Sequence, residues 1–194
     1  FLKARLAYKK TEVLAEYFMP TTVRLINGPP LDEIETEENT VFEPGGLQVA
    51  ESLIYPSVDS ERIDELKREL QKLLIGCKRM EKLWEEMAFT EAHIFDASKL
   101  EVFRIITLSI TGFDTPLAKN AINESIASLE SVSNYLSFYS SDASELNRLV
   151  NAAVNYMKAN NDFDSFDRMT FIVSYANPLT KEIVQQQKDK GLRF

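Results

Sequence analysis

The chain has 194 residues, of which 44% are hydrophobic and 27% charged, a composition typical of a folded domain rather than a disordered one. Its 22 basic and 30 acidic residues give a formal charge of −8. That balance argues against a sequence-independent nucleic-acid binder, because such proteins need a cationic face. Cys77 is the only cysteine, which excludes an intramolecular disulfide and a Cys-x-x-Cys-His haem attachment site within these residues.

Apolar residues recur at helical spacing along most of the chain, which predicts an all-α helical bundle of about seven helices. The length favours a single domain over 1–194, with two packed half-bundles as the alternative. The first helix is expected to cover most of the range from Leu2 to Arg24, with Pro20 as a kink in its last turns. Its expected apolar face consists of Leu6, Val13, Leu14, Tyr17 and Phe18. No apolar run approaches the roughly 20 residues of a membrane-spanning helix.

The stretch from Asn27 to Glu43 is expected to be an irregular, solvated loop, because it contains Gly28-Pro29-Pro30 and then a run of like charges. The acids of this run are Asp32, Glu33, Glu35, Glu37, Glu38 and Glu43. A hard-cation site there is the less favoured interpretation, because the ordered Asp-x-Asp-x-Asp-Gly pattern of a calcium loop is missing.

The next segment carries unusual polar residues on a short helix. Pro44 fits a first helical position and Pro56 prevents continuation, so the helix between them is about three turns long. Gln48 and Glu51 are three residues apart and share its apolar face. If that face is buried, each must be hydrogen-bonded, paired or metal-bound, because an unpartnered polar group in an apolar site costs several kcal/mol.

Two interpretations of this polar pair are open. In the structural one, which is favoured, Glu51 pairs with a cation such as Arg5 or Lys9, and Gln48 holds the preceding loop. In the functional one, Glu51 and Gln48 are metal ligands.

A sustained three-four spacing of apolar residues predicts a long helix between Ile63 and Met87, with one face in a bundle seam. The seam consists of Ile63, Leu66, Leu70, Leu73, Cys77, Met80, Trp84 and Met87. Asp59 and Ser60 are the expected caps of this helix.

Beyond this seam, the segment from Val102 to Phe113 is apolar on nearly every side and predicts a central, fully surrounded helix. Gly112 is expected to end it in a left-handed conformation. His93 is the only histidine. A single histidine near the start of a helix is more often a cap or packing residue than a base or ligand.

Three more helices are expected in the C-terminal part of the chain. Thr115 and Pro116 should open the first of them, and Asp142 with Glu145 resembles a capping box for the second. The last is capped by Asp164 or Ser165 and is bent or interrupted at Asn177-Pro178. Their apolar faces are Ala118, Ile122, Ser125, Leu129, Val132, Leu136 and Tyr139; Leu146, Leu149, Val150, Ala153 and Met157; and Phe166, Met169, Ile172, Val173, Ala176, Leu179, Ile183 and Val184.

No catalytic motif is legible. The chain has no Gly-rich phosphate loop, no Gly-x-Ser-x-Gly elbow and no His/Cys spacing typical of a metal site. A substrate-acting enzyme is therefore the least favoured function class, and the pattern alone stops at an acidic, all-helical domain.

The segment from Gly46 to Tyr55 resembles the Gly-x-His-x-x-Glu motif of the imelysin family, exported bacterial proteins linked to iron. Gln48 stands where that family has His, and an amide oxygen is a poorer ligand for a transition metal than imidazole. Only Glu51 carries over unchanged.

A closer resemblance is to the helical region ahead of the two-haem domain in certain bacterial di-haem cytochrome c peroxidases. Five segments spread along the chain carry it: 4–10 (ARLAYKK), 16–20 (EYFMP), 25–29 (LINGP), 110–116 (ITGFDTP) and 166–172 (FDRMTFI). The resemblance implies an imelysin-like bundle in the periplasm or cell envelope. It also implies a longer chain, with haem c and peroxidase chemistry in a domain after Phe194, and no cofactor within these residues.

Two functions follow as hypotheses. The first is a non-catalytic accessory or interaction domain that docks or orients a di-haem peroxidase domain or another envelope protein. The second is an imelysin-like metal-binding or iron-handling module centred on Gln48 and Glu51, with the acids of the Asn27 to Glu43 loop as further candidates.

Overall fold

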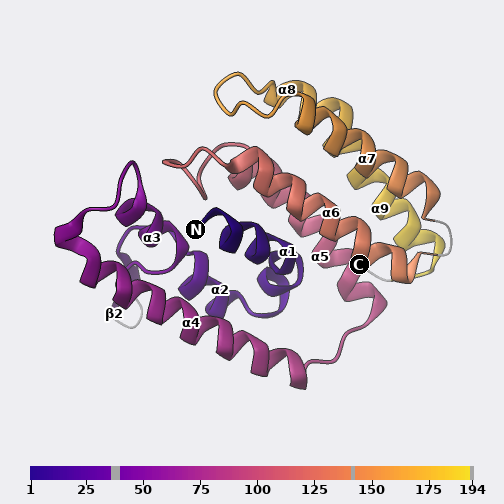
Figure 1. The fold of residues 1–194 in the computed structure, drawn as a ribbon. Helices are drawn as coiled ribbons and strands as arrows, with labels where there is room; N and C mark the ends of the chain where they lie inside the picture. Colours follow the sequence, from indigo (N-terminus) through magenta and orange to yellow (C-terminus); the bar gives the residue numbers. More distant parts are fainter. Residues whose placement is uncertain (36–39, 141–142, 193–194) are drawn as a thin grey trace. The chain divides into compact units, whose positions relative to one another are not determined.

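The computed structural model describes residues 1–35, 40–140 and 143–192, and most of this part of the chain is helical (Figure 1). Its eight continuous helical stretches confirm the expected all-α bundle of about seven helices. No described helix is long and apolar enough to cross a membrane. The contacts divide the chain into two compact units. Unit 1 comprises Phe1–Phe18, Ala88–Phe113 and Lys119–Phe194, and unit 2 comprises Met19–Met87 and Asp114–Ala118.

Unit 1 is built around a long central helix. Its helices are α1 (Leu2–Phe18), α5 (Glu91–Arg104), α6 (Ala121–Tyr139), α7 (Ser144–Ala159), α8 (Arg168–Phe171) and α9 (Asn177–Asp189). Two π-helical segments, η2 (Ile105–Ser109) and η3 (Ile172–Ala176), extend α5 and join α8 to α9. The central helix α6 packs against α1, α5 and α7 (Figure 1). Its fully buried Leu129 and Leu136 belong to the core of this unit.

Unit 2 is smaller and has one long helix against which two short ones pack. Its elements are α2 (Pro20–Asn27), β1 (Glu33–Glu35), β2 (Thr40–Phe42), α3 (Leu47–Ile54), η1 (Ser60–Arg62) and α4 (Ile63–Glu86). Both α2 and α3 contact α4 (Figure 1). The apolar core side chains include Val23, Ile26, Leu53, Leu73 and Met80, all of them buried.

The first helix is confirmed from Leu2 to Phe18, but the kink expected at Pro20 is a break between two helices. The chain leaves the helical conformation at Met19, with φ −133° and ψ 47°, and Pro20 opens a second helix. The reason is that proline disfavours the helical conformation in the residue before it, while its own fixed φ suits a first helical position.

The stretch from Asn27 to Glu43 is also more ordered than expected. In place of an irregular loop, β1 and β2 form an antiparallel pair in which Ile34 lies opposite Val41. Glu37 and Glu38 lie outside the described residues, and Asp32 and Glu43 are exposed, as a solvated segment requires. In this pair the backbone N–H and C=O groups of the two short strands bond one another.

The long helix α4 is confirmed, but its seam is displaced. Asp59 caps the turn before it, because its carboxylate accepts a hydrogen bond from the backbone N–H of Glu61 at 2.9 Å. Its buried residues are Glu69, Leu73, Gly76 and Met80. The expected seam residues Ile63, Leu70 and Cys77 are exposed instead.

The apolar segment from Val102 to Phe113 is not fully surrounded. Phe103 and Phe113 are exposed, while Val102 and Ile105 are buried. Gly112 has φ +84° and ends the segment in the left-handed conformation, as expected.

Two helix starts differ from expectation, and one helix is confirmed. The helix α6 begins at Ala121, so Thr115 and Pro116 lie outside it. Asp167, rather than Asp164 or Ser165, caps α8 through a 2.9 Å bond from the backbone N–H of Thr170. The expected apolar face of α7 is buried at Leu146, Val150, Ala153 and Met157. The proposed cap Asp142 lies outside the described residues.

The Asn177-Pro178 dipeptide does not interrupt the last helix. The π-helical segment η3 ends directly before Asn177, and α9 continues through Pro178. A wider π-helical turn changes the hydrogen-bond register and so accommodates the missing proline N–H.

Candidate functional site

The helix α3, which carries the polar pair, is shorter than expected because it begins at Leu47 rather than at Pro44. Gly46 precedes it with φ +92°, and a Cβ there would lie 2.3 Å from the carbonyl oxygen of Ile26. Only glycine adopts such a conformation without strain. The backbone at Gly46 therefore fixes where the helix starts, and Pro44 lies outside it.

Glu51 is buried, with an exposed fraction of 1%. Its Oε1 accepts hydrogen bonds from Thr115 Oγ1 at 2.9 Å and from the backbone N–H of Ala118 at 2.7 Å. The expected ion pair with Arg5 or Lys9 is therefore wrong, because a hydroxyl and a backbone amide supply the donors. Hydrogen bonds to a carboxylate are stronger than neutral ones, so this contact ties α3 to the 114–118 segment.

Gln48 is 3% exposed and lies one turn before Glu51. Its Nε2 donates to the carbonyl oxygen of Asn27 at 3.3 Å and, more weakly, to Asp114 Oδ1 at 3.5 Å. The first bond holds the C-terminal end of α2, where the loop that precedes α3 begins. This confirms the expectation that Gln48 holds the preceding loop. Gln48 Oε1 and Glu51 Oε2 are buried without a hydrogen-bond partner in the described chain.

These two oxygens form a small donor set for a metal. One belongs to an amide and the other to a carboxylate whose second oxygen is already engaged. Within 1–35, 40–140 and 143–192 there is no group of three or more His, Cys, Asp or Glu side chains that could hold a metal ion. Buried polar atoms without a protein partner are also common sites for an ordered water. The assignment of Gln48 and Glu51 as metal ligands stays a prediction.

Unit 1 contains a second set of buried polar residues, which the sequence analysis missed. Arg5 on α1 binds Glu124 on α6 through two hydrogen bonds, from Nε to Oε1 at 2.6 Å and from Nη2 to Oε2 at 2.8 Å. Both side chains are at most 1% exposed. Asn120 Nδ2 adds a 3.3 Å bond to Glu124 Oε1. This two-pronged geometry is the one that best offsets the cost of burying a charge pair.

The same set continues along α1. Lys9 Nζ donates to Glu12 Oε2 at 2.6 Å, and both side chains are 1% exposed. Arg104 on α5 reaches Glu12 Oε1 at 3.3 Å and also pairs with Glu16. The set so far contains three cations, Arg5, Lys9 and Arg104, and the three carboxylates that pair with them, so its charges cancel. It has one further ionisable member.

That seventh member is Glu101 on α5. Both carboxyl oxygens are buried without a hydrogen-bond partner, and Oε2 lies 3.9 Å from Arg104 Nε, at the outer limit of an ion pair. Burial, and then the negative charge of Glu12, raise the pKa of Glu101 to about 8, against the opposing effects of Lys9 and Arg104. Glu101 is therefore mainly protonated at neutral pH, which keeps the buried set electrically balanced.

One signal in the sequence could have revealed this set. Arg5, Lys9, Glu12 and Glu16 fall at spacings of four, three and four, which places them on one helical face. A charged face at helical spacing is usually solvated, and only the facing charges on α5 and α6 make it an interior one.

His93 is a packing residue, one of the two roles expected for it. Its ring lies 5.9 Å from the ring centroid of Tyr17 and 5.4 Å from that of Phe18. Thr90 caps the helix by accepting a 3.3 Å hydrogen bond from the backbone N–H of His93.

Comparison with known protein families, curated proteins and solved structures finds no match to this chain. The resemblance to imelysin and to the region ahead of the peroxidase haem domain thus depends on the sequence segments alone. No relative supplies an activity, ligand or partner, and the function has to be argued from the buried polar residues, the helix surfaces and the cavities of the chain itself.

Proposed function

We propose that this chain is a non-catalytic interaction domain whose partner is a di-haem cytochrome c peroxidase domain, in the periplasm or cell envelope. The peroxidase partner and the location come from the resemblance of the sequence segments. The interaction itself is supported by one structural observation, an apolar stripe along α4 that the described chain leaves uncovered.

The α4 stripe consists of Ile63, Leu70, Leu74 and Cys77. The last three are spaced by four and three residues, so they share one side of the helix. Leu70 and Leu74 are 46% and 55% exposed, although burying the remaining surface would stabilise each by about 1 kcal/mol. A row of large apolar side chains on a helix is typical of a surface that lies against another helix.

The buried polar residues support a non-catalytic role. Glu51 Oε1 and Gln48 Nε2 bind backbone groups and short side chains, and most of the buried charges of unit 1 bind one another. Such contacts stabilise a fold, whereas a catalytic group must reach a substrate.

The test is calorimetric titration of the 194-residue chain with the isolated two-haem domain of a bacterial di-haem cytochrome c peroxidase. A saturable complex is expected. Leu70→Ser/Leu74→Ser should weaken it by about tenfold or more, because the apolar area lost corresponds to at least 1.4 kcal/mol. The matched control is Ile75→Ser, which removes an exposed apolar side chain from the other side of α4 and should leave the affinity unchanged.

Three results would overturn the proposal. The first is the absence of binding, and the second is equal weakening by Ile75→Ser and by the double variant. The third is stoichiometric haem binding by the isolated chain with peroxidase turnover, which would make it a catalytic domain.

The second candidate function is a metal-binding or iron-handling module centred on Gln48 and Glu51. It is favoured by the two buried oxygens that have no hydrogen-bond partner, Gln48 Oε1 and Glu51 Oε2. It ranks second because a transition metal or calcium ion needs four or more ligands, so other groups or waters would have to complete the site.

Calorimetric titration with ferrous, ferric, zinc, copper and calcium ions tests this candidate. If the site is real, one ion binds saturably and Glu51→Ala abolishes the binding. Asp32→Ala, which removes an exposed acid of the same unit, is the control and should have no effect. If the ion still binds to the Glu51→Ala variant, its site is elsewhere in the chain and this candidate function is wrong.

A further inference from the structure

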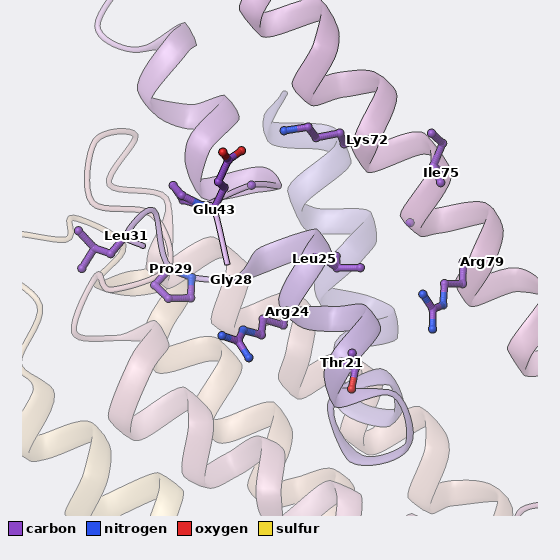
Figure 2. Close-up of a pocket in the computed structure, with 13 residues that line it drawn as sticks. Thr21, Arg24, Leu25, Gly28, Pro29, Leu31, Glu43, Lys72, Ile75 and Arg79 are labelled. Carbon is purple, nitrogen blue, oxygen red and sulfur yellow. The ribbon is translucent and has the colours of Figure 1, made fainter. Parts of the chain in front are cut away.

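Unit 2 contains a cavity of about 620 Å³ on the side of α4 away from the apolar stripe. Its walls come from α2, from the connection after α2, from the residues before α3, and from α4. Among the lining residues labelled in Figure 2, Lys72, Ile75 and Arg79 come from α4, and Thr21, Arg24 and Leu25 come from α2. The volume lies within the range of 300–1,000 Å³ that is common for small-molecule sites.

The cavity walls are largely apolar and reach solvent. Leu25, Leu31 and Ile75 are 51%, 68% and 68% exposed, and Pro29 and Pro44 lie beside them in the lining. Exposed apolar side chains that converge on one concavity differ from isolated surface leucines, because a single ligand can cover them together.

The charge of the cavity is opposite to that of the chain. Its lining includes Arg24, Lys72 and Arg79 and a single described acid, Glu43, in a protein of formal charge −8. Lys72 is paired with Glu69 at 2.7 Å. Arg79 makes no ion pair with any described residue, so its positive charge is available to a ligand. Cations gathered beside low-dielectric walls attract anions.

We propose that this cavity binds a small organic anion with an apolar tail, of the class of the medium-chain carboxylates. The carboxylate lies against Arg79, whose planar guanidinium donates two hydrogen bonds to such a group. The tail covers Leu25, Leu31 and Ile75. Lys72 and Arg79 are seven residues apart on α4, about 10 Å along its axis, which leaves room for the tail between the Arg79 end and the Glu69–Lys72 pair.

This proposal does not depend on the peroxidase partner, because the cavity and the α4 stripe use different sides of α4. The Ile75→Ser variant that serves as a control for the stripe removes part of the cavity wall. The two proposals therefore fail separately.

The test is calorimetric titration of the chain with decanoate below its micelle concentration, next to decanol and decyltrimethylammonium, which carry the same tail on a neutral and a cationic head. Decanoate should bind at one site, and the other two at least about tenfold more weakly. Arg79→Glu should weaken decanoate binding by about tenfold or more, and Ile75→Ser by a smaller factor. Lys78→Glu makes the same charge change at the neighbouring exposed position and should stay within about twofold.

Four results would overturn the proposal: no saturable decanoate binding, equal affinity for decanol, equal weakening by Lys78→Glu and Arg79→Glu, or unchanged binding by Ile75→Ser. Thermal melts of the variants accompany the titrations. Both charge changes are at exposed residues, so the fold is expected to persist in each.

Discussion

The carboxyl of Glu101 gives unit 1 a titratable interior. Its pKa is raised from the ordinary 4.5 to about 8 by burial and by the charge of Glu12. In the unfolded chain the same carboxyl ionises near 4.5, so between these values the folded state binds one more proton than the unfolded state. The stabilising contribution of this group is complete below pH 4.5 and is lost progressively as the pH rises to about 8.

Replacing Glu101 by glutamine should remove that pH dependence, because the amide imitates the protonated carboxyl at every pH. We expect the free energy of unfolding of Glu101→Gln to exceed that of the wild type by a margin that grows between pH 5 and pH 8, by at most about 1.4 kcal/mol per pH unit. Urea unfolding at several pH values measures it. Glu130→Gln, at an exposed position of α6, is the control. Parallel stability curves for wild type and Glu101→Gln would contradict the assignment.

Glu51 is the residue whose structural role is most directly testable. Glu51→Ala leaves Thr115 Oγ1 and the backbone N–H of Ala118 without their acceptor and should cost about 3 kcal/mol, the scale of two hydrogen bonds to a charged group. Glu51→Gln keeps an acceptor oxygen in the same place and should cost about 1 kcal/mol. Chemical denaturation separates the two variants. Equal and small losses would mean that the two hydrogen bonds contribute little to stability.

At the scale of the element, the start of α3 depends on backbone conformation more than on the sequence of the helix itself. Gly46→Ala should destabilise the chain by about 3 kcal/mol, because it combines a positive φ with a Cβ 2.3 Å from the carbonyl oxygen of Ile26. Gly45→Ala is the matched control: the nearest atom to its Cβ would be Glu69 Oε2 at 3.5 Å, an ordinary contact. Its cost should stay within about 0.5 kcal/mol. Similar melting temperatures for the two variants would show that the Gly46 backbone can relax.

The helices that the sequence predicted well are those stabilised by an apolar face. On α7 the three-four spacing of Leu146, Val150 and Ala153 corresponds to the buried side of the helix. On α1 the same rule succeeds only at Val13, which is buried, because Arg5 and Lys9 are buried while the other expected core residues are only half-buried. A prediction from periodicity places every charged residue on the solvent side of a helix. It contains no information on a distant partner such as Glu124, which is 119 residues from Arg5.

Across the whole chain, contacts between residues far apart in the sequence are what could not be predicted about the candidate site. The burial of Gln48 and Glu51 was predictable from their apolar neighbours, because that signal is local. The partners of Glu51 were not, since Thr115 and Ala118 come from a segment 64 and 67 residues further along the chain. Both residues were expected to belong to the next helix. Because α6 begins only at Ala121, the hydroxyl of Thr115 and the backbone N–H of Ala118 lie before it and can donate to Glu51.

The overall charge of −8 and the uncovered α4 stripe have opposite effects on self-association of the chain: the charge disfavours it and the apolar stripe favours it. Mutual repulsion keeps copies apart at low ionic strength, and salt screens it, since the Debye length falls from about 30 Å at 0.01 M to about 3 Å at 1 M. Sedimentation velocity should therefore show self-association that increases with sodium chloride. Leu70→Ser/Leu74→Ser should remain monomeric throughout, because its apolar contact area is lost while its charge is unchanged. If the double variant self-associates as the wild type does, contacts between copies use another surface, and the α4 stripe loses the physical property on which its role as a docking surface depends.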